Sequence, residues 1–118
     1  MRAQVRRLHT PDADDLASFA PEDDGDFALL VQIIAGPEGA DGEESFDLEV
    51  ITPRELARRV EGSGPMSGRH LLIVNRFDAD HIAAWIDKSV AACSGGSWVE
   101  VAEQLGRIGH WEFEDYRR

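Results

Sequence analysis

The sequence predicts an α+β domain: a mostly antiparallel sheet of about four to five strands with about three helices packed on one face. Two strand patterns that lie close in sequence predict a hairpin, and three helix starts follow it along the chain. The predicted order is strand, strand, strand, helix, strand, helix, helix and a short final strand, without repeats or an interdomain linker. We therefore expect one domain over residues 1–118.

The central hairpin is predicted at residues 27–35 and 43–52. The first segment is apolar on both faces, as in a central strand. The second alternates, with Phe46, Leu48 and Val50 on the inward face and polar or acidic residues between them. A glycine-proline turn and a broad acidic loop join the two segments, so they should pair with each other.

Three further segments complete the predicted sheet. Residues 2–8 read as a short strand, residues 70–77 as a buried strand, and residues 110–113 as a short strand at the end of the chain. Trp111 in the final strand suits either the core or an exposed anchor for a partner, so both roles stay open.

The first helix start is Thr52, which is followed by Pro53 and Glu55. Threonine can accept a free amide bond, proline suits the first helical position, and the glutamate closes a capping box. This helix should run to about Val60, before a glycine-rich stretch.

Two further helices begin at Asp78 and at Ser97, where Glu100 again completes a capping box. Their apolar residues recur at helical spacing and predict the faces that pack on the sheet. These stripes are Ile82, Trp85, Ile86, Val90 and Cys93 in the second helix, and Trp98, Val101, Ala102, Leu105 and Ile108 in the third.

Composition indicates a folded, soluble protein. Hydrophobic residues make up 42% of the 118 residues, an ordinary share for a globular domain, so the acidity does not signal disorder. The single cysteine excludes an internal disulfide and fits a reducing compartment. The N-terminus lacks the apolar run of a signal peptide, and no stretch approaches the ~18 apolar residues of a membrane helix. We expect a cytoplasmic location.

The net charge of −11 is concentrated in the first half of the chain. Residues 1–50 hold 13 acids and 3 bases, whereas residues 51–118 hold 10 acids and 9 bases. The excess lies in the long loop before the hairpin and in the loop of the hairpin itself. Such a field repels nucleic acid and anionic membranes and attracts basic proteins. We expect no nucleic-acid and no membrane partner; the alternative is a solvated loop that only keeps the protein soluble.

Signals for catalysis are weak. His9, His70, His81 and His110 lie on different predicted elements, without the spacing of metal ligands on a helix. Cys93 falls on an apolar stripe, as a small core residue does. The acids lie in loops and on polar strand faces, where carboxylates stay solvated with ordinary proton affinity. The sequence predicts no catalytic residue, no metal site and no cofactor, and therefore no enzyme.

Several short segments form an ordered set along nearly the whole chain. The most specific are GEESF at residues 42–46 and GHWEF at residues 109–113. The others are residues 8–12, 21–23, 36–37, 52–53, 68–70 and 97–98 with 105–108. Together they resemble the immunity protein 8 family of bacterial polymorphic-toxin systems. The resemblance implies a small cytoplasmic α+β protein, encoded beside a toxin, that binds and neutralises that toxin and has no catalytic residues.

The resemblance and the charge pattern together predict stoichiometric, charge-assisted binding of a toxin domain. Nuclease toxins have basic substrate clefts, so a nuclease is one candidate, although the sequence does not identify the toxin's chemistry. The expected partner-binding residues are the acids of the two loops and part of the final strand: Asp12, Asp14, Asp15, Glu22, Asp23, Asp24, Glu43, Glu44, Asp47, Glu49, Trp111 and Glu112.

Two other classes of function remain open at this point. One is an acidic adaptor module for a different basic partner, which the neighbouring genes would distinguish from an immunity protein. The other is a small hydrolase that uses scattered histidines and carboxylates. It would need a concave pocket that joins a residue such as His9, His70 or His110 to buried carboxylates.

Overall fold

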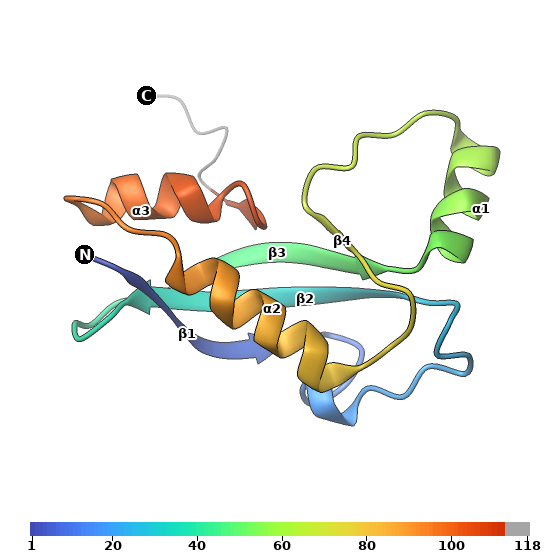
Figure 1. Cartoon of the computed structure of the whole chain (residues 1–118), viewed down its shortest axis with the longest axis horizontal. Coiled ribbons are helices and arrows are strands. Elements are labelled where there is room, and N and C mark those ends of the chain that lie inside the picture. Colours follow the sequence, from blue (N-terminus) through green and yellow to red (C-terminus); the bar gives the residue numbers. More distant parts are fainter. Residues whose placement is uncertain (113–118) are drawn as a thin grey trace.

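A computed structural model describes residues 1–112 and contains a five-stranded sheet (Figure 1). The strands are β1 (Ala3–His9), β2 (Ala28–Pro37), β3 (Glu44–Ile51), β4 (Leu71–Ile73) and β5 (His110–Trp111). They lie in the order β1-β2-β3-β4, and β5 pairs with β3 alongside β4. The expected final strand is therefore present as β5, whereas Phe113 lies outside the described residues.

The long hairpin of β2 and β3 is confirmed as the centre of the sheet. The two strands pair antiparallel from Ala28 opposite Ile51 to Ala35 opposite Glu44. Strand β1 pairs antiparallel with the other edge of β2, with an irregularity between Val5 and Arg7. The pairing of β4 with β3 is the one parallel pairing among these strands of residues 1–112, so the sheet is mostly antiparallel.

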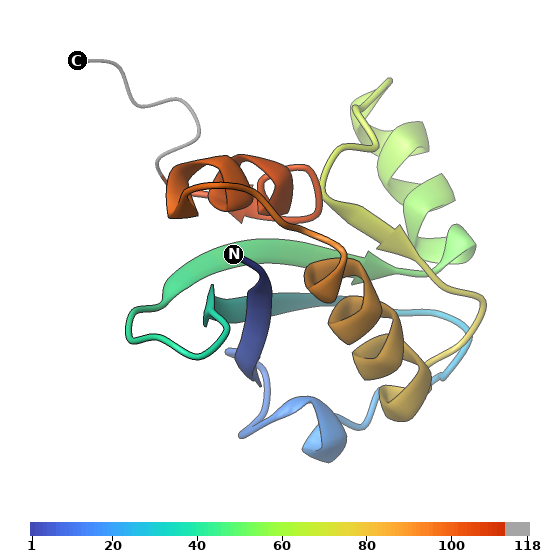
Figure 2. The same cartoon turned by 60° about the vertical axis from the view of Figure 1, so that its left-hand side comes forward.

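Two helices close the apolar face of the sheet, α2 (Ala79–Ala91) and α3 (Trp98–Leu105) (Figures 1 and 2). Their buried residues join the inward side chains of β2 and β3 in one hydrophobic cluster. Helix α2 contributes Ile82, Ile86 and Val90, and helix α3 contributes Val101, Ala102 and Leu105. With a third helix described next, the α+β fold class is confirmed.

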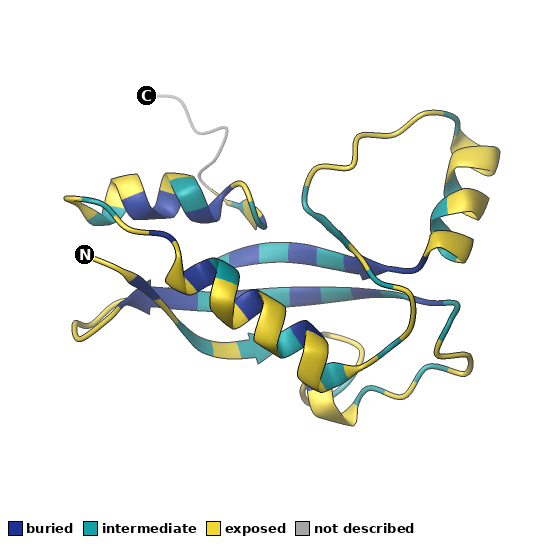
Figure 3. Ribbon diagram, viewed as in Figure 1, coloured by how far each residue is buried: buried dark blue, intermediate teal, exposed yellow. Residues whose placement is uncertain are grey.

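Helix α1 (Pro53–Ser63) lies apart from this core, and all 11 of its residues remain at least partly exposed (Figure 3). Its Arg59 pairs with Glu49 of β3. Glu49 alternates with the buried Leu48 and Val50 and therefore points to the opposite face of the sheet. Helix α1 thus forms the crossover that parallel pairing of β3 and β4 requires, on the face away from α2 and α3, so the expectation that all the helices pack on one face is wrong for α1.

Two of the three predicted helix caps are confirmed. Asp78 accepts a bond from the His81 amide at 3.1 Å, and Ser97 accepts one from the Glu100 amide at 3.3 Å. Thr52 does occupy the N-cap position before Pro53, as predicted, but the expected capping bond from its side chain is absent. Its buried hydroxyl instead accepts from the Phe27 amide at 3.0 Å and donates to the Phe27 carbonyl at 3.2 Å. This exchange ties the start of β2 to the start of α1.

Two burial predictions are wrong in the region that follows α1. The apolar run at residues 70–77 forms a strand only over Leu71–Ile73, and Ile73 is 54% exposed. Trp85 was expected on the buried stripe of α2 but is 43% exposed. Both follow from one cause: β4 lies at the end of the sheet, and the flank of α2 that carries Trp85 faces a hollow beside it.

The end of the described chain packs against β3. A side-chain carbon on Gly109 would lie 3.0 Å from the Phe46 backbone, so any larger residue here would have to push β3 away by a few tenths of an ångström. The next residues form β5, where Trp111 stacks on Phe46 with ring centroids 6.2 Å apart. Trp111 is half-buried, which makes it a partial member of the core that still reaches the surface.

Candidate interaction surface

The hairpin acids Glu44 and Glu49 are held by partners within the protein. Glu44 accepts a hydrogen bond from the indole Nε1 of Trp98 at 2.6 Å, which connects β3 to α3. Glu49 accepts two bonds from the Arg59 guanidinium, each 2.6 Å long. These bonds raise the pKa of Arg59, partly offset by its burial. Both carboxylates therefore hold the fold together, and neither is free for a partner.

Three other predicted residues lie on the sheet face that points away from the core. Asp47 and Glu112 line a hollow of about 240 Å³ together with Gln32, Ser45 and His110. The hollow forms because β5 pairs with β3, which places His110 opposite Asp47. Glu43 lies at the end of this face and forms an exposed ion pair with Arg7 at 3.0 Å. The structure thus brings Asp47 and Glu112 together, while Glu43 is already paired.

In the long loop, three of the six predicted acids are engaged. Asp15 caps η1 (Leu16–Ser18), where its carboxylate accepts bonds from the Ser18 hydroxyl at 2.6 Å and amide at 2.9 Å. Asp23 lies 3.6 Å from Arg54, and Asp24 lies 3.9 Å from Arg76. All three residues are nevertheless exposed, and the ion pairs of Asp23 and Asp24 are long and open to solvent.

The other three loop acids are exposed without such partners. Within residues 1–112, no hydrogen bond or ion pair holds the carboxylates of Asp12, Asp14 and Glu22. The loop itself is fixed to the body by the buried Leu16 and by Phe19, whose ring packs against Phe27 and Phe77. A fixed loop presents these carboxylates at defined positions and does not leave them on a free tail.

Two acids that the sequence analysis did not select lie beside this loop. Asp80 and Asp87 of α2 line a hollow of about 330 Å³ together with Asp15, and its apolar walls come from β1, η1 and α2. They were missed because the second half of the chain is nearly neutral overall. Their spacing of seven residues, which places both on one side of a helix, was the available signal. The acidic surface therefore extends from the loop onto α2.

The titratable groups indicate a surface that stays anionic. The hydrogen bonds from Ser18 lower the pKa of Asp15, and the hydrogen bond from Arg58 lowers the pKa of Asp26. Burial raises the pKa of the Cys93 thiol, so this cysteine stays protonated and is a poor nucleophile. The arrangement is suited to attracting cations or basic proteins.

The histidines have different surroundings, although the rings of His70 and His110 meet edge to face with centroids 5.7 Å apart and His110 shares a hollow with Asp47 and Glu112. The His9 ring lies 2.6 Å from the Gln32 side chain, His81 lies 3.6 Å from Asp78, and His70 contacts the Gly106 carbonyl at 2.6 Å. Residues 1–112 contain no group of three or more histidine, cysteine or acidic side chains that could hold a metal ion. Within the same residues, none of the helices is long and apolar enough to cross a membrane.

Comparison with known families matches residues 3–116 to the family described as Immunity protein 8. Neither the comparison with curated proteins nor that with solved structures gives a match. The family match covers nearly the whole chain and includes β1 to β5 with all three helices. The match indicates an immunity protein, and the partner of an immunity protein is in general a toxin. The chain therefore belongs to the Immunity protein 8 family.

Proposed function

We propose that this protein neutralises a cognate polymorphic toxin by binding it stoichiometrically, without turnover. The observation that carries the proposal is the anchored loop that exposes Asp12, Asp14 and Glu22 without ion partners among residues 1–112. Exposed carboxylates without partners in the protein break no internal bond when a basic partner approaches. They are the groups best suited to attract and orient such a partner.

The charge distribution also favours fast binding, which an inhibitor of a toxic protein needs. Opposite charges on two proteins steer their encounter and can raise association rates to ~10⁸–10⁹ M⁻¹s⁻¹ at low salt. Asp80 and Asp87 of α2 extend the acidic surface beside the loop, and only Arg7 among the residues that line the same hollow is basic. This part of the surface should therefore dominate the attraction.

The hairpin acids should contribute less, although four of them are among the predicted binding residues. Glu44 and Glu49 would have to give up hydrogen bonds to Trp98 and Arg59 before they could bind a partner. Asp47 and Glu112, on the face away from the core, remain as the second candidates on this side of the molecule.

The partner on this account is a toxin domain with a basic surface, and a nuclease fits because its substrate is anionic. Carboxylates at the basic cleft of a nuclease would occupy the positions that substrate phosphates otherwise take. The free thiol of Cys93 fits a reducing compartment, so we place the protein in the cytoplasm, where such a toxin would act.

A titration against the toxin encoded beside this chain tests the proposal. Toxin activity should fall linearly with added protein and reach an end-point at a fixed molar ratio. The end-point should not move with incubation time, because nothing is turned over. Progressive loss of toxin activity at substoichiometric amounts of the protein would show catalysis and overturn the proposal.

A further inference from the structure

The free edge of the sheet at β4 has main-chain groups available for another strand. Within residues 1–112, β3 is the one strand that pairs with β4. In this parallel pairing, Glu49 donates to the His70 carbonyl at 3.0 Å and Val74 donates to the Ile51 carbonyl at 3.0 Å. Because alternate residues of a strand bond to the same neighbour, the amide and carbonyl of Ile73 point to the opposite, unpaired side.

Although β4 is only three residues long, its edge carries neither a charge nor a proline, two of the features that protect a sheet from further pairing. Proteins usually place charges, proline or a bulge on an exposed edge strand. Residues 71–74 are Leu-Leu-Ile-Val, without a charge or a proline, and the side chain of Ile73 is 54% exposed. An apolar edge that stays accessible is typical of a site for strand addition.

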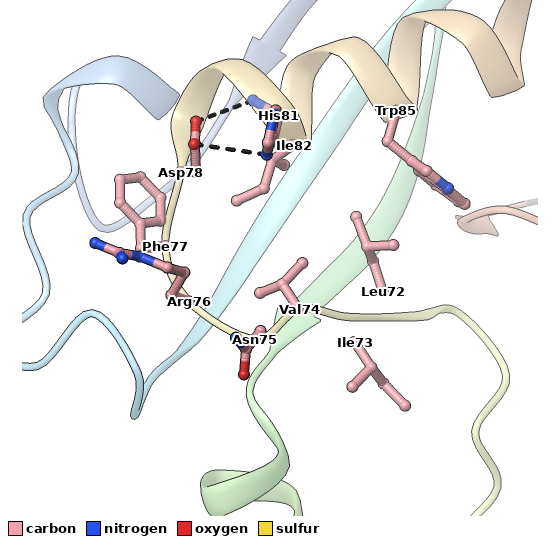
Figure 4. Close-up of a pocket in the computed structure, with 10 residues that line it drawn as sticks. All are labelled: Leu72, Ile73, Val74, Asn75, Arg76, Phe77, Asp78, His81, Ile82 and Trp85. Carbon is pink, nitrogen blue, oxygen red and sulfur yellow. Dashed lines mark hydrogen bonds and ion pairs between the residues drawn. The ribbon is translucent and has the colours of Figure 1, made fainter.

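A hollow of about 700 Å³ adjoins the same edge, between β4 and α2. Figure 4 shows Leu72 and Val74 pointing towards α2, where Trp85 and Ile82 lie, while Ile73 points the opposite way. A strand added beside Ile73 would direct alternate side chains to the two faces, and one set would enter this hollow. The 43% exposed Trp85 then provides a wall against which an apolar side chain can pack.

One end of the hollow lies beside the acidic loop, so charged residues surround it. Phe77 donates to the Asp24 carbonyl at 2.7 Å, so the loop runs directly beside the segment that leaves β4. Asp78 lines the hollow, and Asp24 lies 3.9 Å from Arg76 in a pair that is mostly exposed. Glu22 and Asp23 precede Asp24 in the same loop. With Arg54 and Arg76 as the nearby bases, this end has a net negative charge.

We infer that the toxin adds an extended segment to the edge of β4, with an apolar side chain in the hollow against Trp85 and a basic side chain towards Asp78 and Asp24. The inference rests on the proposed function, since it takes the toxin as the partner. It adds a second contact of a different kind: the acidic loop attracts the toxin, whereas hydrogen bonds to Ile73 and apolar packing hold it.

Matched lysine substitutions test the inference with the toxin encoded beside this chain. Ile73→Lys places a charge on the unpaired edge, and Val99→Lys places the same charge on α3 at a residue that is 59% exposed. We expect Ile73→Lys to weaken binding at least about tenfold, mainly through faster dissociation, because it interrupts packing in the bound state. Val99→Lys should change the affinity less than about twofold. Trp85→Ala, which leaves the strand intact, should also weaken binding.

Hydrogen exchange provides an independent readout on the wild-type protein. Exchange at the Ile73 amide should slow when the toxin is added, because a strand added there accepts its hydrogen bond. Suppose the wild type binds tightly, its Ile73 exchange does not change, and Ile73→Lys binds as strongly as Val99→Lys. These results would overturn this inference and leave the proposed function standing. Failure of the wild type to bind the toxin would overturn both.

Discussion

The two acidic stretches of this protein look alike in sequence but have different physical roles. In the hairpin, Glu44 and Glu49 are bonded to Trp98 and Arg59, side chains that the fold brings from α3 and α1. In the loop before β2, the carboxylates of Asp12 and Asp14 lie exposed. Glu44 and Glu49 therefore contribute to stability, whereas Asp12 and Asp14 make no bond that a partner would have to break.

The difference shows that the number of acids in a segment does not measure its capacity to bind. A carboxylate that accepts hydrogen bonds from an indole or a guanidinium must break them before it can bind a partner. The free energy of those bonds is then lost. The exposed carboxylates of the loop carry no such cost. Substitution of Glu44 or Glu49 should therefore lower stability, whereas substitution of the exposed loop acids should mainly slow binding.

The largest effect on stability is expected from Glu44→Ala. The substitution leaves the half-buried Nε1–H of Trp98 without its acceptor, which should lower the free energy of unfolding by about 1–2 kcal/mol. Glu44→Gln keeps an acceptor oxygen and serves as the control, with a smaller loss. Chemical denaturation measures both, and equal midpoints for the two variants would show that the Trp98 bond does not matter.

A smaller effect is expected from Glu49→Ala. Its pair with Arg59 is about one-third exposed, so solvent weakens it, and the loss should be about 0.5–1 kcal/mol. A double-mutant cycle with Arg59→Ala isolates the interaction. We expect the double variant to be more stable than the sum of the single losses implies. Strictly additive losses would contradict a structural role for this pair.

The smallest effect concerns the dependence of stability on pH through Asp15. Hydrogen bonds from Ser18 lower its pKa in the folded state below the ordinary value of 3.8, so folding favours the ionised form. This contribution is fully present above pH 3.8 and is lost as the pH falls through the lower, folded pKa.

Melting temperatures of wild type and Asp15→Asn, recorded from about pH 6 to about pH 2.5, test this linkage. Asparagine keeps a capping oxygen but does not titrate, so the variant's stability does not depend on pH through this residue. The wild type should lose stability relative to the variant below pH 3.8. A constant difference across the range would rule out the contribution.

Local sequence patterns were sufficient for the elements that depend on neighbouring residues. The alternation of Phe46, Leu48 and Val50 predicted β3, and Asp78 and Ser97 predicted the starts of α2 and α3. The patterns failed where the environment is set by distant residues. Thr52 has the spacing of a cap, but the fold places the backbone of Phe27 within reach of its hydroxyl.

The apolar run at residues 70–77 failed as a predictor of burial for a similar reason. Hydrophobicity alone does not show whether a strand lies at the centre or at the end of a sheet, and only Leu71–Ile73 pair with β3. The exposure of Trp85 on the flank of α2 follows from the same topology.

For the candidate interaction surface, the sequence singled out the two acidic stretches but could not rank their residues. The partners of Glu44 and Glu49 lie 54 and 10 residues away along the chain, so spacing gave no sign of them. Asp80 and Asp87 were overlooked because the second half of the chain is nearly neutral overall, although in space they border the loop.

The measurement that tests the central claim most directly compares charge reversals in the two regions. The loop variant carries lysine in place of Asp12, Asp14 and Glu22. The hairpin variant carries lysine in place of Glu38, Asp41 and Glu43, all exposed, so both variants have the same net charge. Association rates with the toxin are recorded at about 10 mM and about 500 mM salt, which differ strongly in screening.

At low salt the loop variant should associate about three- to tenfold more slowly than the hairpin variant, because the local field at the docking surface governs steering. The difference should largely disappear at high salt. Equal association rates for the two variants at low salt would contradict the account, since net charge alone, and not the carboxylates of the loop, would then determine binding.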